Sequence, residues 1–302
     1  MLSVRLAWAA ALITPALLLA VLDYRWGEVA PGIWLYPLGA ALTLLAVWEL
    51  HGLCQAVFGS PPALLWLLAA ACPMAAMAVP VYQSLVGLSD EPLTATRVFG
   101  CYLAGQFVGL VLVWIAEMGR FRQPGGQAIL RLAGTAWSVV YVTVPLAFLL
   151  ATRCLASNEQ GMFALVTLVV TVKLSDSGAY FVGSTLGRRK LAFYLSPNKT
   201  IEGAIGGVVF AVAAVLLLVA LIRPWLVPHA KAPHWTGWAV LGVTLAVAAA
   251  AGDLAESLVK RDVQQKDSGR WLPGLGGALD LLDSLLWSAA VNYAFWAFGW
   301  VE

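Results

Sequence analysis

The sequence carries little charge. Only 11% of its 302 residues are charged, whereas 61% are hydrophobic and the mean hydropathy is +0.83. Water-soluble globular domains carry roughly 25% charged residues, so this composition excludes a water-soluble protein. It also excludes an intrinsically disordered chain, which combines low hydrophobicity with high net charge. The composition indicates a protein of the lipid bilayer.

Several common motifs are absent as well. The chain has no P-loop, no H-E-x-x-H zinc motif and no G-x-S-x-G nucleophile elbow, so the soluble enzyme folds that carry them are not expected. The net charge of +2 gives no indication of a nucleic-acid partner. The cysteines stand singly in or beside apolar runs and form no C-x-x-C pair, which predicts small core residues instead of a disulfide framework or a metal site. They are Cys54, Cys72, Cys101 and Cys154.

Long apolar runs, in contrast, fill the chain. Nine stretches reach roughly 18 residues or more, which is enough for a helix to cross a bilayer. Backbone groups in hydrocarbon must be hydrogen-bonded within their own segment, so these stretches are predicted to be helices. The first is interpreted as a retained span and not as an export signal. The predicted fold class is all-α, polytopic, with about nine transmembrane helices at residues 4–22, 31–49, 62–82, 96–116, 128–151, 160–182, 202–222, 236–258 and 282–300.

The basic residues predict an orientation in the membrane. Twelve Lys and Arg residues fall on one side of the nine spans and five on the other. The positive-inside rule therefore places the amino terminus, loop 183–201 and loop 259–281 in the cytoplasm. The short loops, and the absence of organelle-targeting features, favour a bacterial inner membrane.

The ionisable residues also suggest two functional regions. Residues 173–283 hold eight of the sixteen acids and eleven of the eighteen bases. We therefore expect residues 1–172 to form a transmembrane scaffold that could mediate dimerisation. Residues 173–302 are expected to form the catalytic region.

One of these acids, Asp176, lies within an apolar run, one helical turn after Lys173. An ionisable group at membrane depth costs about 2.5 to 3.5 kcal/mol, so it indicates a functional site. The alternative is a Lys173–Asp176 pair that neutralises itself inside the bundle.

A second segment has the features of a phosphate cradle. Ser196 and Thr200 are residue types that begin helices, Glu202 would lie in the first turn, and Lys199 stands beside them. The amino terminus of a helix attracts phosphate groups. The alternative is that nearby glycines serve helix packing and that the basic loop is a topology signal.

The strongest pattern begins at Asp253. Asp253, Glu256 and Lys260 fall on one stripe of a helix, and Asp280 and Asp283 share a face at the start of the last span. Two pairs of acids that bracket a basic, glycine-rich loop suit Mg²⁺ and polyphosphate chemistry, because carboxylates bind the metal and Lys or Arg bind the phosphate oxygens. The alternative is a solvated loop between salt-bridged helix ends. The loop adds Arg261, Lys266, Asp267, Gly276 and Gly277 to the candidate residues.

These residues resemble the phosphatidate cytidylyltransferases, also called CDP-diacylglycerol synthases. The similarity covers roughly residues 173–286, and the first half is similar only in being apolar and multispanning. The matching motifs are Asp176-x-Gly178-Ala179-Tyr180-x-x-Gly183, Ser196-Pro-x-Lys199-Thr200-x-Glu202-Gly203, Ser257-x-x-Lys260-Arg261-x4-Lys266-Asp267-x-Gly269 and Pro273-Gly274-x-Gly276-Gly277-x-x-Asp280-x-x-Asp283-Ser284.

The resemblance implies transfer of a cytidylyl group from CTP to phosphatidate in phospholipid biosynthesis, by a homodimer. Within that reaction, Asp253 and Asp280 are expected to hold Mg²⁺, with a second cation as an option. Glu256, Asp283 and Asp176 are further ligands or supports, and Asp176 is also a candidate for substrate binding. The remaining residues are expected to bind substrate, with Lys260 also in a catalytic role. They are Ser196, Lys199, Thr200, Glu202, Lys260, Arg261, Lys266, Asp267, Gly276 and Gly277.

The sequence departs from the family pattern at two positions. Leu275 stands where the family usually has His, and Leu281 where it usually has Arg. A divergent or inactive paralogue that acts on another lipid phosphate therefore stays open as an alternative. An ion-coupled transporter is a further alternative, because carboxylates within membrane helices also mark transport pathways. No inverted repeat is visible, and the charges cluster toward one membrane face.

Overall fold

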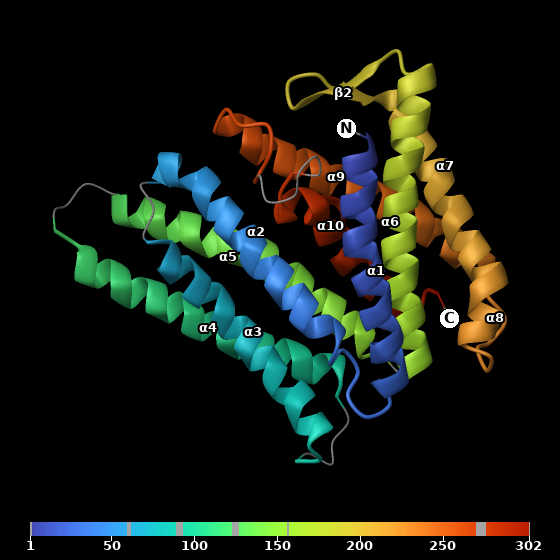
Figure 1. Ribbon diagram of the computed structural model, residues 1–302, viewed down its shortest axis with the longest axis horizontal. Coiled ribbons are helices and arrows are strands. Elements are labelled where there is room, and N and C mark those ends of the chain that lie inside the picture. The colour runs from blue at the N-terminus through green and yellow to red at the C-terminus, as the bar shows by residue number, and fades with distance from the viewer. Residues whose placement is uncertain are drawn as a thin grey trace. The chain divides into compact units, whose positions relative to one another are not determined.

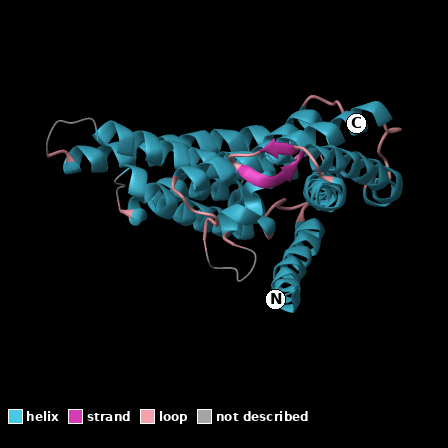
Figure 2. Ribbon diagram, turned by 90° about the horizontal axis from the view of Figure 1, so that it is seen from above, coloured by secondary structure: helices cyan, strands magenta, loops and turns pink. Residues whose placement is uncertain are grey.

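The structure, a computed structural model, describes residues 2–58, 62–88, 93–122, 127–155, 157–269 and 276–301. Helices make up nearly all of it (Figure 1). Within these residues, one two-stranded hairpin is the only β-sheet (Figure 2). The all-α expectation is therefore confirmed except at this hairpin, which the sequence did not predict.

The chain forms two compact units. The first comprises Met1–Cys154 and Asp262–Leu281, and the second comprises Leu155–Arg261 and Leu282–Glu302. These units are defined by packing, so the functional division between residues 1–172 and 173–302 stays a prediction. The first unit contains α1 (Leu2–Trp26), α2 (Leu35–Phe58), α3 (Ala63–Leu85), α4 (Ala95–Arg120) and α5 (Gln127–Arg153).

The second unit contains the remaining elements, apart from the start of the last helix. α10 (Ala278–Ala297) begins in the first unit and continues in the second. The other elements are α6 (Asn158–Leu186), β1 (Lys190–Ala192), β2 (Ser196–Thr200), α7 (Ile201–Leu217), the π-helical turn η1 (Leu218–Ile222), α8 (Arg223–Leu226) and α9 (Trp235–Asp262).

Each of the nine predicted spans falls on a helix or, for 202–222, on the run from α7 to η1. Among the described residues, seven helical runs are long and apolar enough to cross a membrane. They are α2 to α6, the run Ile201–Leu226 and α9. Because α1 and α10 are not among the seven, the count of about nine transmembrane helices is not confirmed.

A buried ion pair fixes one end of the first unit. The Arg153 Nε lies 2.6 Å from the Asp23 Oδ2, and the two side chains are 1% and 0% exposed. Asp23 also accepts hydrogen bonds from the backbone N–H groups of Gly32 and Trp34, so its charge is fully engaged. The pair therefore ties the end of α1 and the following turn to the end of α5.

Glycines allow α3 and α4 to approach each other closely. A Cβ atom added at Gly105 would lie 2.6 Å from the Cys72 carbonyl oxygen, and one at Gly109 would lie 2.5 Å from the Ala69 carbonyl oxygen. Small residues at such contacts are the usual means by which membrane helices pack. Their spacing of four residues puts both glycines on the same face of α4.

The four cysteines are free, and Cys54 and Cys154 are buried. Burial raises the pKa of the Cys154 thiol to about 12. A thiol with so high a pKa stays protonated at neutral pH, and a protonated thiol is a poor nucleophile. This agrees with the prediction of core residues for Cys54 and Cys154, whereas Cys72 and Cys101 are half-buried.

In the second unit, α6 and α7 lie side by side (Figure 1). A Cβ atom added at Gly203 would lie 2.8 Å from the Ala179 carbonyl oxygen, so the two helix backbones nearly touch there. Trp238 and Trp296 pack edge-on at 5.5 Å, and both also contact Phe163. These aromatic side chains join α6, α9 and α10 into one core.

The predicted loop 183–201 has more structure than expected. α6 continues to Leu186, and β1 then pairs with β2 in an antiparallel hairpin. Lys190 lies opposite Thr200 and Ala192 opposite Ser196, with an irregular register between them. The Thr200 Oγ1 accepts a hydrogen bond from the Gly203 N–H at 3.1 Å and so caps α7, as the sequence predicted for a helix start.

Candidate active site

Three carboxylates meet in the second unit. Asp253 and Glu256 lie on α9 and Asp283 lies on α10, and one carboxylate oxygen from each falls within 4.8 Å of the others. Gly252 makes this approach possible, because a Cβ atom there would lie only 2.5 Å from the Asp283 carbonyl oxygen. The structure thus brings together three of the four residues that were predicted to bind the metal, and their role as ligands stays a prediction. We call these three residues the carboxylate cluster.

Two lysines compensate part of the cluster's charge. The Lys199 Nζ lies 2.5 Å from the Asp253 Oδ2, and the Lys260 Nζ lies 2.7 Å from the Glu256 Oε2. Lys199 comes from β2, so the hairpin brings it to α9. Lys260 follows Glu256 by one turn on α9 itself. A cluster of three acids therefore has two cations at its edge.

Asp176 on α6 makes its own set of contacts. Its Oδ2 accepts a hydrogen bond from the Ser284 hydroxyl at 3.0 Å and lies 3.6 Å from the Lys173 Nζ. Ser284 directly follows Asp283 in α10. Asp176 thus holds the residue next to a member of the carboxylate cluster, and it also forms the Lys173 pair that was the alternative interpretation.

Other predicted residues of this unit shape the backbone around the hairpin. Glu202 accepts hydrogen bonds from the Arg188 and Arg189 N–H groups at 3.0 and 3.1 Å, which fixes the segment before β1. The Arg261 Nε donates to the Leu195 carbonyl oxygen at 3.3 Å and ties α9 to the hairpin turn. Ser196 begins β2. Their predicted contacts with substrate stay predictions.

In the first unit, the Asp280 carboxylate accepts hydrogen bonds from two backbone N–H groups and one hydroxyl. Its Oδ2 accepts hydrogen bonds from the Ser268 N–H at 3.0 Å, the Ser268 hydroxyl at 2.8 Å and the Gly277 N–H at 2.8 Å. Gly276 adopts a φ of +91°, which favours glycine, and so allows the chain to turn into α10. Asp280 therefore closes the first turn of α10, and its role as a metal ligand stays a prediction.

Glu49 is a residue that the sequence analysis missed. This α2 side chain is 4% exposed, and its two carboxylate oxygens accept the Ala278 and Leu279 N–H groups, each at 2.9 Å. The Ser268 hydroxyl oxygen also lies 3.0 Å from the Glu49 Oε2, so Glu49 and Asp280 share its one proton. A helix start has free N–H groups and a positive dipole end, so a carboxylate stabilises it. Glu49 therefore fixes the start of α10.

A signal for Glu49 was available in the sequence. It is an acid at the end of an apolar run, the same signal that marked Asp176. Glu49 lies outside residues 173–283, where most charged residues concentrate, so charge density did not point to it.

The remaining residues that the sequence singled out are exposed, lie elsewhere in α10 or fall outside the described residues. Lys266 and Asp267 belong to the first unit and are exposed. Leu281 lies in α10, whereas Leu275 is outside the described residues.

The donor set of the carboxylate cluster suits a hard divalent cation. Mg²⁺ prefers oxygen ligands and is usually held by one or two carboxylates together with substrate phosphates. Asp253 is 34% exposed, so its carboxylate is accessible from solvent, whereas Glu256 is 1% exposed. Asp253 and Asp283 are half-buried and Glu256 is buried, and metal binding by the cluster stays a prediction.

The seven apolar helical runs define an integral membrane protein. Residues 4–298 match the family model described as "Cytidylyltransferase family". The chain belongs to that family.

Curated relatives are similar over about half of the chain. A phosphatidate cytidylyltransferase from Brucella suis biovar 1 is 47% identical over 137 residues, which cover 45% of this chain and 48% of that protein. One from Haemophilus influenzae is 40% identical over 133 residues, covering 44% of each. One from Staphylococcus aureus strain COL is 40% identical over 151 residues, covering 49% and 53%. The chain thus spans about half the length of the curated relatives it matches.

Proposed function

We propose that the protein transfers a cytidylyl group from CTP to phosphatidate and forms CDP-diacylglycerol and pyrophosphate. The observation that carries the proposal is the carboxylate cluster with Lys199 and Lys260 at its edge, within helices that are apolar enough for a membrane. Membership of the cytidylyltransferase family and the names of the relatives support the same reaction. The bacterial origin of those relatives supports an inner-membrane location, and the basic loops support a cytoplasmic site.

The proposed reaction needs little covalent help from the protein. A phosphate oxygen of phosphatidate attacks the α-phosphorus of CTP and forms a new P–O bond. The bond from that phosphorus to the bridging oxygen breaks, and its electron pair leaves with pyrophosphate. The second pKa of a phosphate monoester is about 6, so the attacking oxygen is already ionised at neutral pH and needs no strong general base. Positioning and charge compensation are the main tasks of the site.

The lysines are suited to the charge compensation. Lys199 is 25% exposed and Lys260 is 12% exposed, and each can exchange its carboxylate partner for a phosphate oxygen. Arg261 follows Lys260 and adds a further cation at the end of α9. Mg²⁺ held by Asp253 and Asp283, with Glu256 and Asp280 as further candidates, would supply charge neutralisation on the triphosphate. A second cation is an additional option within the proposal.

The test is pyrophosphate release by the full chain in lipid nanodiscs with CTP, phosphatidate and Mg²⁺. We expect release to require all three, and Asp253→Asn to lower the rate at least 100-fold. Glu28→Gln is the matched control, because Glu28 is an exposed acid in the turn after α1. Equal rates for Asp253→Asn and the unsubstituted protein would overturn the role of the cluster.

Leu281 supports one variant of this proposal. Where the family usually has Arg, this chain offers no charge, so a different lipid phosphate could be the acceptor. If the well-folded protein releases no pyrophosphate with phosphatidate but releases it with another lipid phosphate, the alternative acceptor is favoured. We also propose a homodimer, on the family resemblance, and mass measurement of the nanodisc-bound protein is its check.

A further inference from the structure

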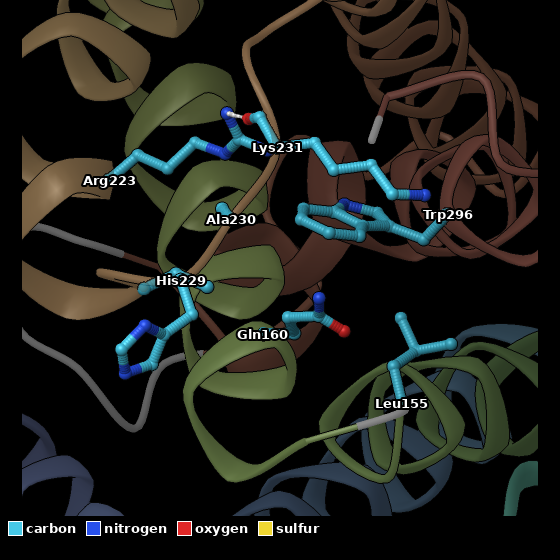
Figure 3. Close-up of a pocket in the computed structure, with 8 residues that line it drawn as sticks. Leu155, Gln160, Arg223, His229, Ala230, Lys231 and Trp296 are labelled. Atoms are coloured by element: carbon cyan, nitrogen blue, oxygen red, sulfur yellow. Dashed lines mark hydrogen bonds between the residues drawn. The ribbon is translucent and has the colours of Figure 1, made fainter.

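A small cavity lies in the second unit, between the start of α6, the segment from α8 to α9 and the end of α10 (Figure 3). Its volume is about 190 Å³, below the roughly 300–1,000 Å³ of pockets that hold drug-sized ligands. A nucleotide is therefore too large for it, and a small ion or a single headgroup is the right size. Its polar and aromatic lining consists of Gln160, Arg223, His229, Lys231 and Trp296.

Arg223 is the central residue of the cavity. It is only 7% exposed, and its Nη1 donates to the Lys231 carbonyl oxygen at 2.9 Å. Its guanidinium carbon also lies 5.7 Å from the centre of the Trp238 ring. In the part of the chain that the structure describes, no carboxylate pairs with this guanidinium. A buried cation is costly unless an anion compensates it, so Arg223 indicates an anionic ligand.

The local backbone explains why Arg223 is held here. The helical run from α7 widens into the π-turn η1 directly before Arg223, and the Arg223 N–H bonds to the Leu218 carbonyl oxygen. Pro224 follows, and its ring and missing N–H do not fit a regular helix interior. Single π-turns occur frequently at functional sites. The π-turn accommodates Pro224 and sets the direction of Arg223.

The rest of the lining adds hydrogen-bond donors. The Trp296 Nε1 is buried without a hydrogen-bond partner among the described residues. The contacts of this ring with Phe163 and Trp238 hold it in place. Figure 3 shows the side chains of Arg223, Lys231, Trp296 and Gln160 around the same space. Among the described residues no acid lines the cavity, and the apolar Leu155, Val227 and Ala230 complete its lining.

This cavity is distinct from the candidate active site. Trp238, which contacts Arg223, precedes Asp253 by fifteen residues on α9. At 1.5 Å per residue the two lie about 22 Å apart along the helix. By the predicted orientation, the active site faces the cytoplasm and this cavity faces the opposite side of the membrane. A ligand here is therefore not CTP or its pyrophosphate product at the active site.

We propose that the cavity binds a phosphate group, presented either by the headgroup of an anionic phospholipid or by free phosphate. A guanidinium offers a planar set of donors that matches phosphate oxygens. The Trp296 Nε1–H and the Gln160 amide would complete the binding. Phosphate groups are abundant at the membrane surface, where the predicted orientation places this end of the helices.

The test uses the full chain in dodecyl maltoside, a detergent without phosphate. One experiment titrates inorganic phosphate against chloride at constant ionic strength and measures the melting temperature. A second adds dioleoylphosphatidylglycerol and counts the retained lipids by native mass spectrometry. The variants are Arg223→Gln and Trp296→Phe, which replaces the indole by a smaller aromatic ring and removes the N–H donor. Arg25→Gln is the control, because Arg25 is exposed and predicted to lie on the same side of the membrane.

We expect at least a tenfold loss of affinity in Arg223→Gln, a smaller loss in Trp296→Phe and none in Arg25→Gln. If lipid is retained and free phosphate does not change the melting temperature, the ligand is a lipid headgroup. If free phosphate raises the melting temperature and no lipid is retained, the ligand is a free anion. Phosphate also stabilises proteins generally by exclusion from their surface. A shift of equal size in all variants would therefore overturn the proposal, as would the absence of binding in both experiments. If Arg223→Gln fails to fold, the affinity of Trp296→Phe compared with that of Arg25→Gln is the test.

Discussion

At the scale of single residues, the two lysines beside the carboxylate cluster differ in their surroundings. The Lys199–Asp253 pair is partly exposed, at 25% and 34%. Lys260 instead neutralises Glu256, whose side chain is 1% exposed. Solvent weakens an exposed ion pair, whereas removing one partner of a buried pair leaves an uncompensated charge. The two lysines should therefore respond differently to substitution.

We expect Lys199→Gln to change the free energy of unfolding by less than about 1 kcal/mol but to lower kcat/KM at least tenfold, because a cation at the phosphates is lost. Lys260→Met should destabilise the protein by about 3 to 5 kcal/mol. Denaturant unfolding and pyrophosphate release measure the two effects. Lys190→Gln is the control, since Lys190 is exposed on the other strand of the hairpin. A large stability loss in Lys199→Gln with normal kcat/KM would contradict the assignment.

The residues of the carboxylate cluster were partly predictable. Asp253 and Glu256 are three residues apart, and helical periodicity alone puts them on one face. That Asp283 joins them depends on the contact between α9 and α10, which Gly252 permits and which no local pattern reveals. The hydrogen bonds of Asp280 to Ser268 were equally hidden, because the two residues are twelve positions apart and no local pattern relates them.

At the scale of elements, Glu49 links α2 to the start of α10. A hydrogen bond to a charged group contributes about 1.5 to 3 kcal/mol, and Glu49 accepts two from backbone N–H groups and shares the Ser268 hydroxyl proton with Asp280. A Cβ atom at Gly269 or Gly277 would overlap the Glu49 carboxylate, so both glycines are needed for this contact.

Glu49→Ala is expected to destabilise the protein by about 3 kcal/mol or more and to speed tryptic cleavage after the exposed Lys266 several-fold. The Ala278 and Leu279 N–H groups of α10 lose their acceptor in this variant, whereas the Ser268 hydroxyl keeps Asp280 as a partner. Pyrophosphate release should fall too, because Asp280 lies in the turn that Glu49 holds. Thermal unfolding and timed proteolysis measure the effect against Glu28→Ala. Cleavage and melting identical to those of the control would show that Glu49 does not hold this segment.

The helices were far easier to predict than the hairpin. Long apolar runs demand helices in a membrane, whichever tertiary contacts follow. The hairpin consists of strands of three and five residues in a loop of basic residues, Ser, Asn and Pro. Such short strands show no clear alternation of apolar and polar residues, so the usual signal for a strand was missing.

At the scale of the whole molecule, the run Ile201–Leu226 is the most informative span. It has a mean hydropathy of 3.0 over its most apolar window, the highest of the seven. Tyr194, in the hairpin turn, precedes it and is 90% exposed. Ala232 follows it and is exposed. A single crossing by this run must put these two positions on opposite sides of the membrane, whatever the number of other spans.

We therefore expect Tyr194→Cys to react with a membrane-impermeant maleimide only in inverted vesicles, where the cytoplasmic face is outside. Ala232→Cys should react only in right-side-out vesicles. The unsubstituted protein, whose four cysteines include the buried Cys54 and Cys154, gives the background. The reverse pattern would place Lys199 and the carboxylate cluster away from cytoplasmic CTP. Labelling of both positions from one side would mean that Ile201–Leu226 does not cross. The predicted pattern would put the hairpin and Lys199 where CTP is present, with the Arg223 cavity facing the other side.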